Sequence, residues 1–236
     1  MEKSKAKVLL GMSGGVDSSV SALLLKEAGY EVIGCTLELF NCGKCCNIET
    51  YMDAKAVCKQ LGIMHFTFDL KEEFKKYVID DFIECYKNSK TPNPCIECNK
   101  YMKFGIMQKK AKELGCDYIA TGHYAKVEYS QKYRRNVLKA SNAGKKDQSY
   151  VLWSIPKDAL DMVIFPLGDF KDKEKIRNVA RQNNLKVAKK PDSEDICFVP
   201  SGDYKKFLEE NSDIRPKVGN IVNRKKLVLG KHQRTI

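Results

Sequence analysis

A glycine- and serine-rich segment near the start of the chain has the composition of a phosphate-binding loop. Its residues are Gly11, Met12, Ser13, Gly14, Gly15, Val16, Asp17 and Ser18. The glycines let the backbone approach an anion closely, and the serine hydroxyls add hydrogen-bond donors. Asp17 is too negative to contact phosphate itself, so it is better suited to hold Mg²⁺ against the phosphate. The spacing differs from the GxxxxGKS/T loop of P-loop NTPases.

Three cysteines further along the chain could carry sulfur or metal chemistry. Cys95 and Cys98 form a CxxC pair that follows two prolines and opens a predicted helix, and Cys197 lies far downstream between polar and apolar neighbours. The dipole of that helix, with two lysines nearby, favours thiolate over thiol at the CxxC pair. Thiolates attack sulfur and bind metals, so these positions are candidates for catalysis.

The elements that must position these residues alternate between strand and helix. Residues 8–10 form an apolar strand, the loop follows, and residues 20–28 repeat apolar side chains at helical spacing. Further strands are predicted at residues 31–39, 64–69 and 117–121, with helices at 51–61, from 70 through 86, and at 100–114. The alternation predicts an α/β fold, with a parallel, doubly wound sheet that binds its ligand at the carboxyl ends of the strands.

The second half of the chain changes in character near Phe165 and Pro166. We expect a catalytic domain over residues 1–165, a small central domain over 166–215, and the start of a β region over 216–236. Residues 126–140 are predicted to form a hairpin, 146–153 a helix, and 171–183 a charged amphipathic helix. Gly62 and Gly115 each follow a predicted helix, where a left-handed cap is needed.

The charge of the chain points to a polyanionic partner. Lysine and arginine number 42 against 30 acidic residues, for a net charge of +12. Such an excess attracts a phosphate backbone without specifying sequence. No apolar run approaches the roughly 18 residues of a membrane span, so we expect a cytoplasmic protein with no membrane partner. Of the ten cysteines, Cys35, Cys58, Cys85 and Cys116 stand within apolar patterns and are interpreted as core residues.

The loop resembles that of the PP-loop ATP pyrophosphatases, which cleave ATP between the α and β phosphates and adenylate a substrate oxygen. Seven strings occur in the order typical of one family in this group, the tRNA-specific 2-thiouridylases: GMSGGVDSSV, DAKAVCKQLGI, TPNPxxxCNKxxKF, DYIATGHYA, KDQSYVLW, FPLG and DSxxICF. They cover nearly the whole chain, so they are far more specific than the loop alone.

The resemblance implies an enzyme that makes 2-thiouridine at the wobble position (U34) of tRNAs, expected to be those for Lys, Glu and Gln. ATP adenylates the C2 oxygen of the uridine, releasing pyrophosphate, and a persulfide then replaces that oxygen and releases AMP. Cys197 matches the cysteine that accepts the persulfide, and Cys98 matches the nucleophile that frees its sulfur by forming a disulfide. A sulfur donor protein, or sulfide, is the implied source.

Binding roles carry over from the same strings. ATP is expected at residues 11–18, with Leu37 and Gly122 near the adenine. The tRNA is expected at two stretches, which comprise Asn93, Pro94, Cys95, Lys146, Asp147 and Gln148.

The chain departs from the family pattern at Cys95, where many members carry aspartate. With this change, Cys95, Cys98 and Cys197 could hold three irons of a [4Fe–4S] cluster, and we state such a cluster as a hypothesis. A zinc site formed by the CxxC pair with Cys42 and Cys45 is a weaker alternative, because the gap between the pairs exceeds the usual spacing. The chain also ends before the C-terminal β-barrel expected of the family.

Two other functions stay open from the sequence. One is a different PP-loop adenylating enzyme, such as an amidotransferase or a lysidine-type ligase, which needs no CxxC pair with a distant third cysteine. The other is a non-catalytic RNA-binding remnant, which the early end of the chain makes plausible.

Overall fold

The computed structural model describes residues 5–40, 48–191, 196–199, 202–215 and 218–232. Its centre is a parallel five-stranded sheet with strand order β3-β2-β1-β4-β7. The strands are β1 (Lys7–Gly11), β2 (Glu31–Glu38), β3 (Met64–Asp69), β4 (Tyr118–Ala120) and β7 (Val163–Ile164). The predicted parallel sheet is confirmed, and β7 is an additional strand that the sequence pattern did not indicate.

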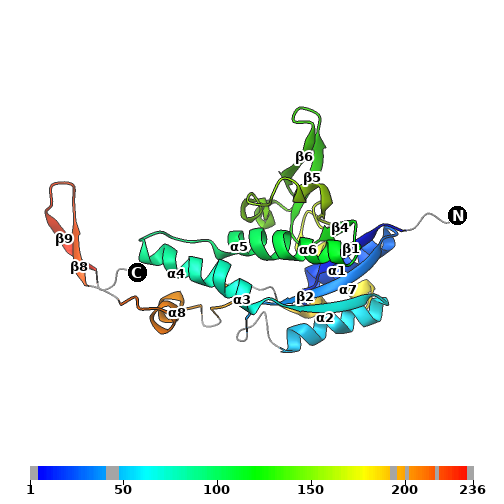
Figure 1. Ribbon diagram of the computed structural model, residues 1–236, viewed down its shortest axis with the longest axis horizontal. Helices are drawn as coiled ribbons and strands as arrows, with labels where there is room; N and C mark the ends of the chain where they lie inside the picture. Colours follow the sequence, from blue (N-terminus) through cyan, green and yellow to red (C-terminus); the bar gives the residue numbers. More distant parts are fainter. Residues whose placement is uncertain (1–4, 41–47, 192–195, 200–201, 216–217, 233–236) are drawn as a thin grey trace.

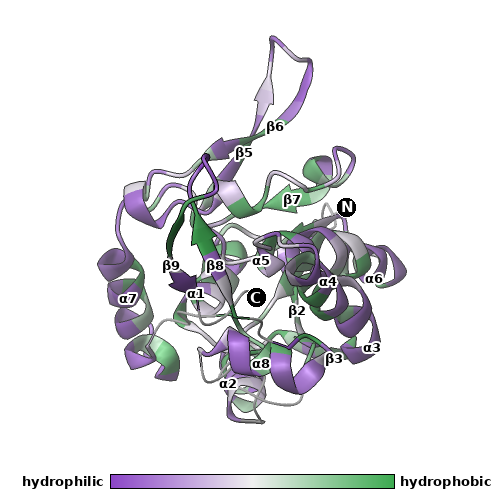
Figure 2. Ribbon diagram, turned by 90° about the vertical axis from the view of Figure 1, so that its left-hand side faces the viewer, coloured by the Kyte–Doolittle hydropathy of each residue, from purple (hydrophilic) through white to green (hydrophobic). Residues whose placement is uncertain are grey.

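Helices cover both faces of this sheet (Figure 2). One face packs against α1 (Val16–Glu27), α2 (Ile48–Leu61) and α7 (Lys173–Gln182). The other packs against α6 (Met107–Glu113) and the short turns η4 (Ser149–Val151) and η5 (Ala159–Met162). Successive side chains of a strand point to opposite faces, and in β1 Val8 and Leu10 join the first core while Leu9 joins the second. The doubly wound arrangement follows from this division.

Two helical runs lie side by side and extend from the sheet (Figure 1). The first joins α3 (Lys71–Phe74), η1 (Lys75–Ile79) and α4 (Asp80–Lys87), and the second joins α5 (Pro94–Glu97), η2 (Cys98–Ile106) and α6. A third apolar cluster packs them against α8 (Tyr204–Asn211). In it, the ring of Phe198 lies 5.3 Å from the rings of both Phe82 and Phe207. This cluster fixes the position of Phe198, and therefore of its neighbour Cys197.

Residues 146–153 do not form the predicted helix. They contain only the end of η3 (Gly144–Lys146), the turn η4 and further turns. Asp147 is extended, with ψ 135°, because its carboxylate accepts hydrogen bonds from the Ser141 backbone N–H at 2.7 Å and the Ser149 hydroxyl at 2.6 Å. A side chain that bonds nearby backbone groups competes with helix formation, and here the loop conformation prevails.

Two hairpins project from the body of the molecule (Figure 1). The predicted hairpin near residues 126–140 is confirmed as β5 (Ala125–Ser130) and β6 (Arg135–Ala140). The second hairpin is formed by β8 (Gly219–Val222) and β9 (Val228–His232). Gly62 and Gly115 have the expected left-handed conformation, with φ of 65° and 68°.

Residues beyond 165 contribute to two different cores. Leu167, α7 and η6 (Lys186–Lys189) pack in the core that contains α1 and α2, whereas Phe198 and α8 pack on the helical runs. The three-part division of the chain at residues 165 and 215 stays a prediction. No helix in the described ranges combines the length and apolar character needed to cross a membrane.

Candidate active site

The phosphate loop lies where the connections of the sheet change direction. The chain moves from β1 outward to β2 and β3, then returns to the other side of β1 with β4. At such a switch point the loops after neighbouring strands diverge and leave a crevice at the carboxyl ends. Gly122, just after β4, faces the start of α1 across this crevice. A Cβ at residue 122 would lie 2.9 Å from the backbone nitrogen of Ser18, so the close approach requires glycine.

Hydrogen bonds among near neighbours hold the loop in shape. The Ser18 hydroxyl donates to the Gly15 carbonyl at 3.2 Å and accepts from the Ser13 backbone N–H at 3.2 Å. Because its one proton is used on Gly15, the 3.2 Å contact between the two serine hydroxyls has Ser13 as donor. Met12 of the loop donates its N–H to a group outside the loop, the Cys35 carbonyl, at 2.7 Å. The loop is therefore preorganised around the start of α1.

Gly14 is the point at which the loop contacts α2. Its φ of +66° lies in the left-handed region, and a Cβ there would collide with the carbonyl oxygen of Thr50 in α2. For both reasons, a residue other than glycine at position 14 would strain the backbone and clash with α2. Gly14 thus sets the distance between the loop and α2.

A cavity of about 530 Å³ opens over the loop. Nine of the ten residues expected to bind ATP line it, and Gly14 is the exception. The other described lining residues are Leu39, Lys103, Met107, Thr121, His123, Tyr124, Lys146, Gln148, Lys173 and Pro191. Three lysines and one carboxylate give the lining an excess of positive charge, which suits a polyphosphate. We refer to this space as the nucleotide cavity.

Asp17, the expected Mg²⁺ ligand, already has two partners. Its Oδ2 lies 2.7 Å from the ammonium of Lys173 in α7, and its Oδ1 accepts a hydrogen bond from the Tyr124 hydroxyl at 2.8 Å. Among the described residues, no group of three or more His, Cys, Asp or Glu side chains is arranged to hold a metal ion. Asp17 therefore offers Mg²⁺ a single carboxylate, and only if Lys173 moves away.

His123 lines the nucleotide cavity as a neutral ring. Its Nδ1 lies 2.7 Å from the Thr121 hydroxyl and its Nε2 lies 3.4 Å from the Lys103 ammonium. An ammonium can only donate, so Nε2 accepts and Nδ1 carries the proton. Burial, reinforced by the positive charge of Lys103, lowers the pKa of His123 well below its usual value. A neutral ring packed against Phe104 and Phe165 fits a structural role better than that of a general base.

The three candidate cysteines meet at a second, smaller space. A cavity of about 220 Å³ is lined by Cys95, Cys98 and Cys197 together with residues from the loop, β2, α2 and the helical runs. Most of its wall is apolar, formed by Leu37, Leu39, Phe74, Val78, Pro94, Ile196 and Phe198. Cys98 is 8% exposed and Cys95 is exposed. We refer to this space as the cysteine cavity.

The two cavities adjoin. Five residues line both of them: Met12, Ser13, Leu37, Leu39 and Lys103. The three cysteines therefore lie next to the nucleotide cavity.

The described residues of the cysteine cavity do not form a metal site. Cys95, Cys98 and Cys197 line the same space, yet they form no metal-binding group in the part of the chain that the structure describes. In this arrangement they do not fit the proposed [4Fe–4S] cluster. Cys42 and Cys45, named for the zinc alternative, lie outside the described residues.

The residues expected to contact tRNA fall in three places. Pro94 and Cys95 line the cysteine cavity, while Asn93 caps α5 by accepting a hydrogen bond from the Cys95 N–H at 3.2 Å. Lys146 and Gln148 line the nucleotide cavity.

Two of these residues also hold the backbone of the site. Asp147 organises its own loop through the bonds to Ser141 and Ser149. Gln148 exchanges hydrogen bonds with Tyr124, donating its backbone N–H at 2.8 Å and accepting the Tyr124 N–H on its side chain at 3.0 Å.

Three of the four cysteines interpreted as core residues are buried, and the fourth, Cys85, is not. Cys35, Cys58 and Cys116 are buried, and Cys85 is half-buried. Burial raises the pKa of the Cys58 thiol to about 11, and burial also raises that of Cys35. Both therefore stay protonated and unreactive at neutral pH.

Sequence reasoning did not assign three charged or polar residues of the site. Lys103 and Tyr124 lie inside strings that carried the family resemblance, so those strings could have indicated them. Lys173 had no such signal, because it lies in a lysine-rich helix whose contact with Asp17 spans 156 positions.

Comparison with known proteins gives one family and many relatives. Residues 6–201 match the family described as tRNA methyl transferase HUP domain. The tRNA-specific 2-thiouridylase MnmA of Clostridioides difficile is 44% identical over 96% of this chain and 64% of its own length. The protein of the same name from Caldicellulosiruptor saccharolyticus is 47% identical over 96% of this chain and 65% of its own length. The chain thus spans less than two thirds of these relatives.

Solved structures support the fold. The U34-tRNA thiolase NcsA of Methanococcus maripaludis, solved with its [4Fe–4S] cluster, aligns with a TM-score of 0.53 at 22% identity, covering 89% of this chain and 68% of that one. A 4-thiouridine synthetase in complex with RNA and ATP aligns with a TM-score of 0.53 at 21% identity, covering 87% and 50%. At this level of identity the likeness concerns the fold alone.

Proposed function

Because this chain belongs to the tRNA methyl transferase HUP domain family, we propose that it converts a uridine of tRNA to 2-thiouridine, using ATP to activate the base. The observation that carries the proposal is the pair of adjoining cavities, one suited to ATP and one lined by three cysteines. Relatives named as tRNA-specific 2-thiouridylases, at 44% and 47% identity, support the same reaction.

The first step uses the nucleotide cavity. The C2 oxygen of the uridine attacks the α-phosphorus of ATP, the bond from that phosphorus to the bridging oxygen breaks, and pyrophosphate leaves. Backbone N–H groups of the loop and the start of α1 bind the phosphates. Leu37 and Gly122 border the adenine. Mg²⁺, bound by Asp17 after Lys173 has moved, would add positive charge at the phosphates.

The second step uses the cysteine cavity. The terminal sulfur of a persulfide on Cys197 attacks C2, and AMP leaves with the former C2 oxygen. The Cys98 thiolate then attacks Cys197 Sγ, so the S–S electron pair passes to the sulfur on the base and 2-thiouridine is released. The two cysteines end as a disulfide, which an external thiol must reduce before the next cycle. The apolar wall excludes water that would hydrolyse the activated base.

The sequence suggested a [4Fe–4S] cluster on Cys95, Cys98 and Cys197 as an alternative sulfur carrier, but the described arrangement of these cysteines does not fit it. A related fold, that of the thiolase NcsA, carries such a cluster, and the third cysteine of the present chain supports the idea. Against it stands the lack of a metal-ready arrangement among the described residues. Iron and sulfide analysis after anaerobic reconstitution separates the two routes. Full activity of the iron-free protein eliminates the cluster.

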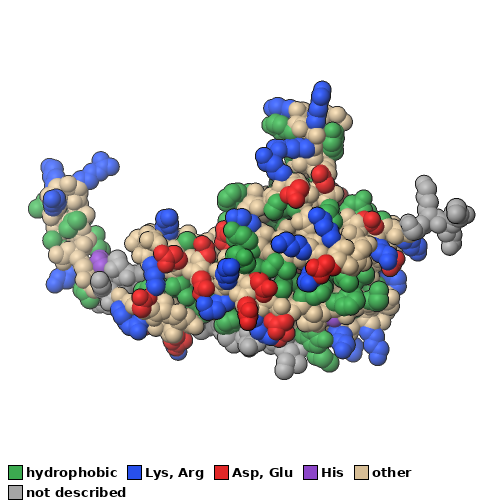
Figure 3. All heavy atoms as spheres, viewed as in Figure 1, with side chains coloured by type: hydrophobic (Ala, Val, Ile, Leu, Met, Phe, Trp, Pro, Cys, Tyr) green, Lys and Arg blue, Asp and Glu red, His purple; other side chains and the backbone are tan. Residues whose placement is uncertain are grey.

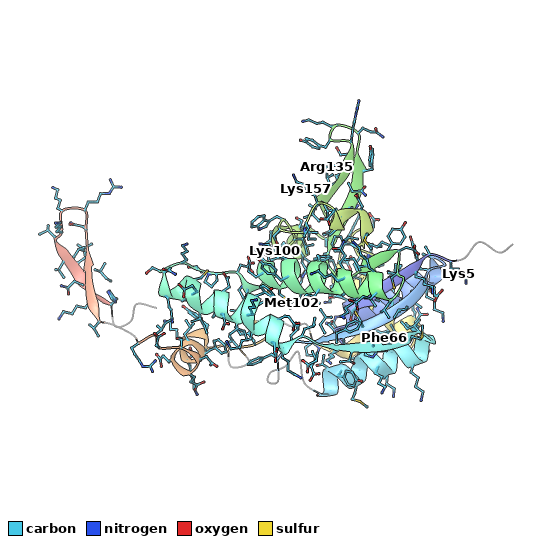
Figure 4. The ribbon with its side chains drawn as sticks, viewed as in Figure 1. Lys5, Phe66, Lys100, Met102, Arg135 and Lys157 are labelled. Carbon is cyan, nitrogen blue, oxygen red and sulfur yellow. The ribbon has the colours of Figure 1, made fainter. Side chains whose placement is uncertain are left out.

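The tRNA itself requires a basic surface. Residues 126–140 of the β5–β6 hairpin contain five lysines and arginines and one glutamate. Cationic side chains gather at its projecting tip (Figure 3), and Arg135 lies on this hairpin (Figure 4). Tyr129 and Tyr133 are exposed at 59% and 57%, so stackable rings stand beside the charges. Positive charge with exposed aromatic rings is typical of surfaces that bind RNA.

The decisive experiment follows two products of one reaction. The chain is incubated with tRNA, ATP, Mg²⁺ and a persulfide donor, then AMP is quantified and the tRNA nucleosides are analysed by mass spectrometry. We expect tRNA-dependent AMP formation together with 2-thiouridine. AMP with an amidated or amino-acid-modified base indicates another PP-loop enzyme. Binding of ATP and RNA without AMP indicates a non-catalytic remnant.

A further inference from the structure

The contact between Lys173 and Asp17 joins two distant parts of the chain inside the nucleotide cavity. Lys173 is the first residue of α7, and Asp17 lies in the first turn of α1. Their side chains are 17% and 27% exposed, and the Nζ–Oδ2 distance is 2.7 Å. The ammonium also lies 6.0 Å from the ring centre of Tyr124, whose hydroxyl occupies the other carboxylate oxygen. This group of three therefore places a mostly buried cation at the phosphate loop.

The position of this cation matters because both a metal ion and a triphosphate would compete for the same partners. A divalent cation that binds Asp17 must displace the ammonium from Oδ2. The displaced ammonium stays tethered to α7 within the nucleotide cavity, beside the loop over which the phosphate chain would lie. A desolvated lysine without an anion is costly, so the exchange of carboxylate for phosphate keeps its charge paired.

On the basis of the ATP-dependent function proposed above, we propose that Lys173 is a phosphate-binding residue. In the absence of nucleotide it neutralises Asp17, and with Mg²⁺ and ATP it binds the oxygens of the β- and γ-phosphates, which become the pyrophosphate leaving group. It thereby ties α7 to the occupied nucleotide cavity.

Nucleotide binding tests the phosphate contact directly. We expect Lys173→Met to weaken binding of ATP and of pyrophosphate about tenfold to a hundredfold, while binding of AMP changes less than twofold. Lys173→Arg, which keeps the charge, should recover most of the loss. Lys175→Met is the matched control, because Lys175 is exposed on the same helix and lines neither cavity.

Metal binding without nucleotide tests the competition for Asp17. We expect Mn²⁺, followed by electron paramagnetic resonance, to bind Lys173→Met severalfold more tightly than the wild type, because the carboxylate no longer has a competing cation. The double variant with Asp17→Asn should lose this gain.

The outcomes separate the two proposals. Equal losses for ATP and AMP, or unchanged ATP binding together with unchanged Mn²⁺ binding, overturn the role of Lys173 while leaving the reaction intact. A wild-type protein that binds neither ATP nor pyrophosphate overturns both proposals. Thermal unfolding of each variant establishes that it is folded before binding is measured.

Discussion

The two cavities of this molecule are built in opposite ways. The nucleotide cavity rests on a contiguous loop whose hydroxyls and carbonyls satisfy one another within six positions of the chain. The cysteine cavity draws its walls from six separate stretches, and most of its lining is apolar. The residues of a phosphate-binding loop can therefore be encoded locally, whereas the cavity proposed for sulfur transfer requires the whole fold.

The difference in polarity matches the two proposed reaction steps. Three lysines line the nucleotide cavity, where negative charge must be attracted and held. Lys103 is the one charged residue among those named for the cysteine cavity, and it is shared with the first. In the proposed reaction, a mostly apolar space would protect the activated base and the persulfide from water until the transfer occurs.

Replacement of Cys98, the thiol that attacks Cys197 in the proposed second step, gives the largest expected effect. It changes the cysteine cavity and leaves the nucleotide cavity as it is. Cys98→Ser should lower 2-thiouridine formation at least about a thousandfold, since a hydroxyl cannot attack the persulfide sulfur at a useful rate. AMP formation in a single turnover should stay within about twofold of the wild type. Nucleoside mass spectrometry and AMP quantification measure the two steps separately.

Cys85→Ser is the control for the cysteine prediction. Cys85 is half-buried in α4 and lines neither cavity. Equal thiolation by Cys98→Ser and Cys85→Ser would contradict the proposed relay.

A substitution at Gly14, where the phosphate loop contacts α2, should affect the nucleotide cavity. Gly14→Ala forces a Cβ into a left-handed backbone and against the Thr50 carbonyl, so the loop must shift. We expect ATP binding to weaken by about a hundredfold, measured by titration calorimetry.

Gly230→Ala is the control for the loop prediction, because a Cβ at that position in β9 meets open space. It should leave ATP binding within twofold. ATP binding by Gly14→Ala at wild-type strength would mean that the loop tolerates displacement.

A third change leaves both cavities intact and tests the projecting hairpin. Replacing Lys132, Arg134 and Arg135 with alanine should weaken tRNA binding about tenfold. It should also reduce the slope of log affinity against log salt by roughly 2, as expected when three phosphate contacts are lost. Filter binding between low and physiological salt measures both quantities.

The charge-matched control for the hairpin removes Lys5, Lys109 and Lys112, which are exposed elsewhere. If both triple variants weaken tRNA binding equally, net charge alone accounts for the effect.

The smallest expected effect concerns pH and the neutral ring of His123. Its pKa is lowered in the folded state, first by burial and then by Lys103, so the unfolded chain binds more protons below pH about 6.5. The free energy of unfolding is therefore unaffected by the titration of His123 above pH about 6.5 and decreases as the pH falls below that value. Thermal unfolding at pH 7.5, 6.5 and 5.5 should show a smaller acid loss for His123→Gln than for the wild type.

His65 also contributes to the loss of stability in acid, because burial and Lys55 lower its pKa as well. It should leave a residual acid loss in His123→Gln. An unchanged acid loss in that variant would mean that His123 does not titrate as its surroundings indicate.

Several elements were predictable because their signals are local. The strands and helices around the phosphate loop follow from apolar periodicity and from glycines at turns, and the β5–β6 hairpin follows from alternation. Residues 146–153 were predicted wrongly as a helix because the decisive bonds of Asp147 reach across the loop to Ser141. The strand β7 was missed because two residues carry too little periodicity, and pairing with β4 is what makes it a strand.

By itself, the sequence determined that a phosphate-binding loop joins β1 to α1, because the required residues are adjacent and their hydrogen bonds close within one turn. Only the tertiary structure decided that Cys197 lines the same cavity as Cys95 and Cys98, and that Lys173 reaches Asp17. These contacts join residues about a hundred positions or more apart. They depend on the packing of the apolar cores, and no local pattern in the chain specifies which distant side chains that packing brings together.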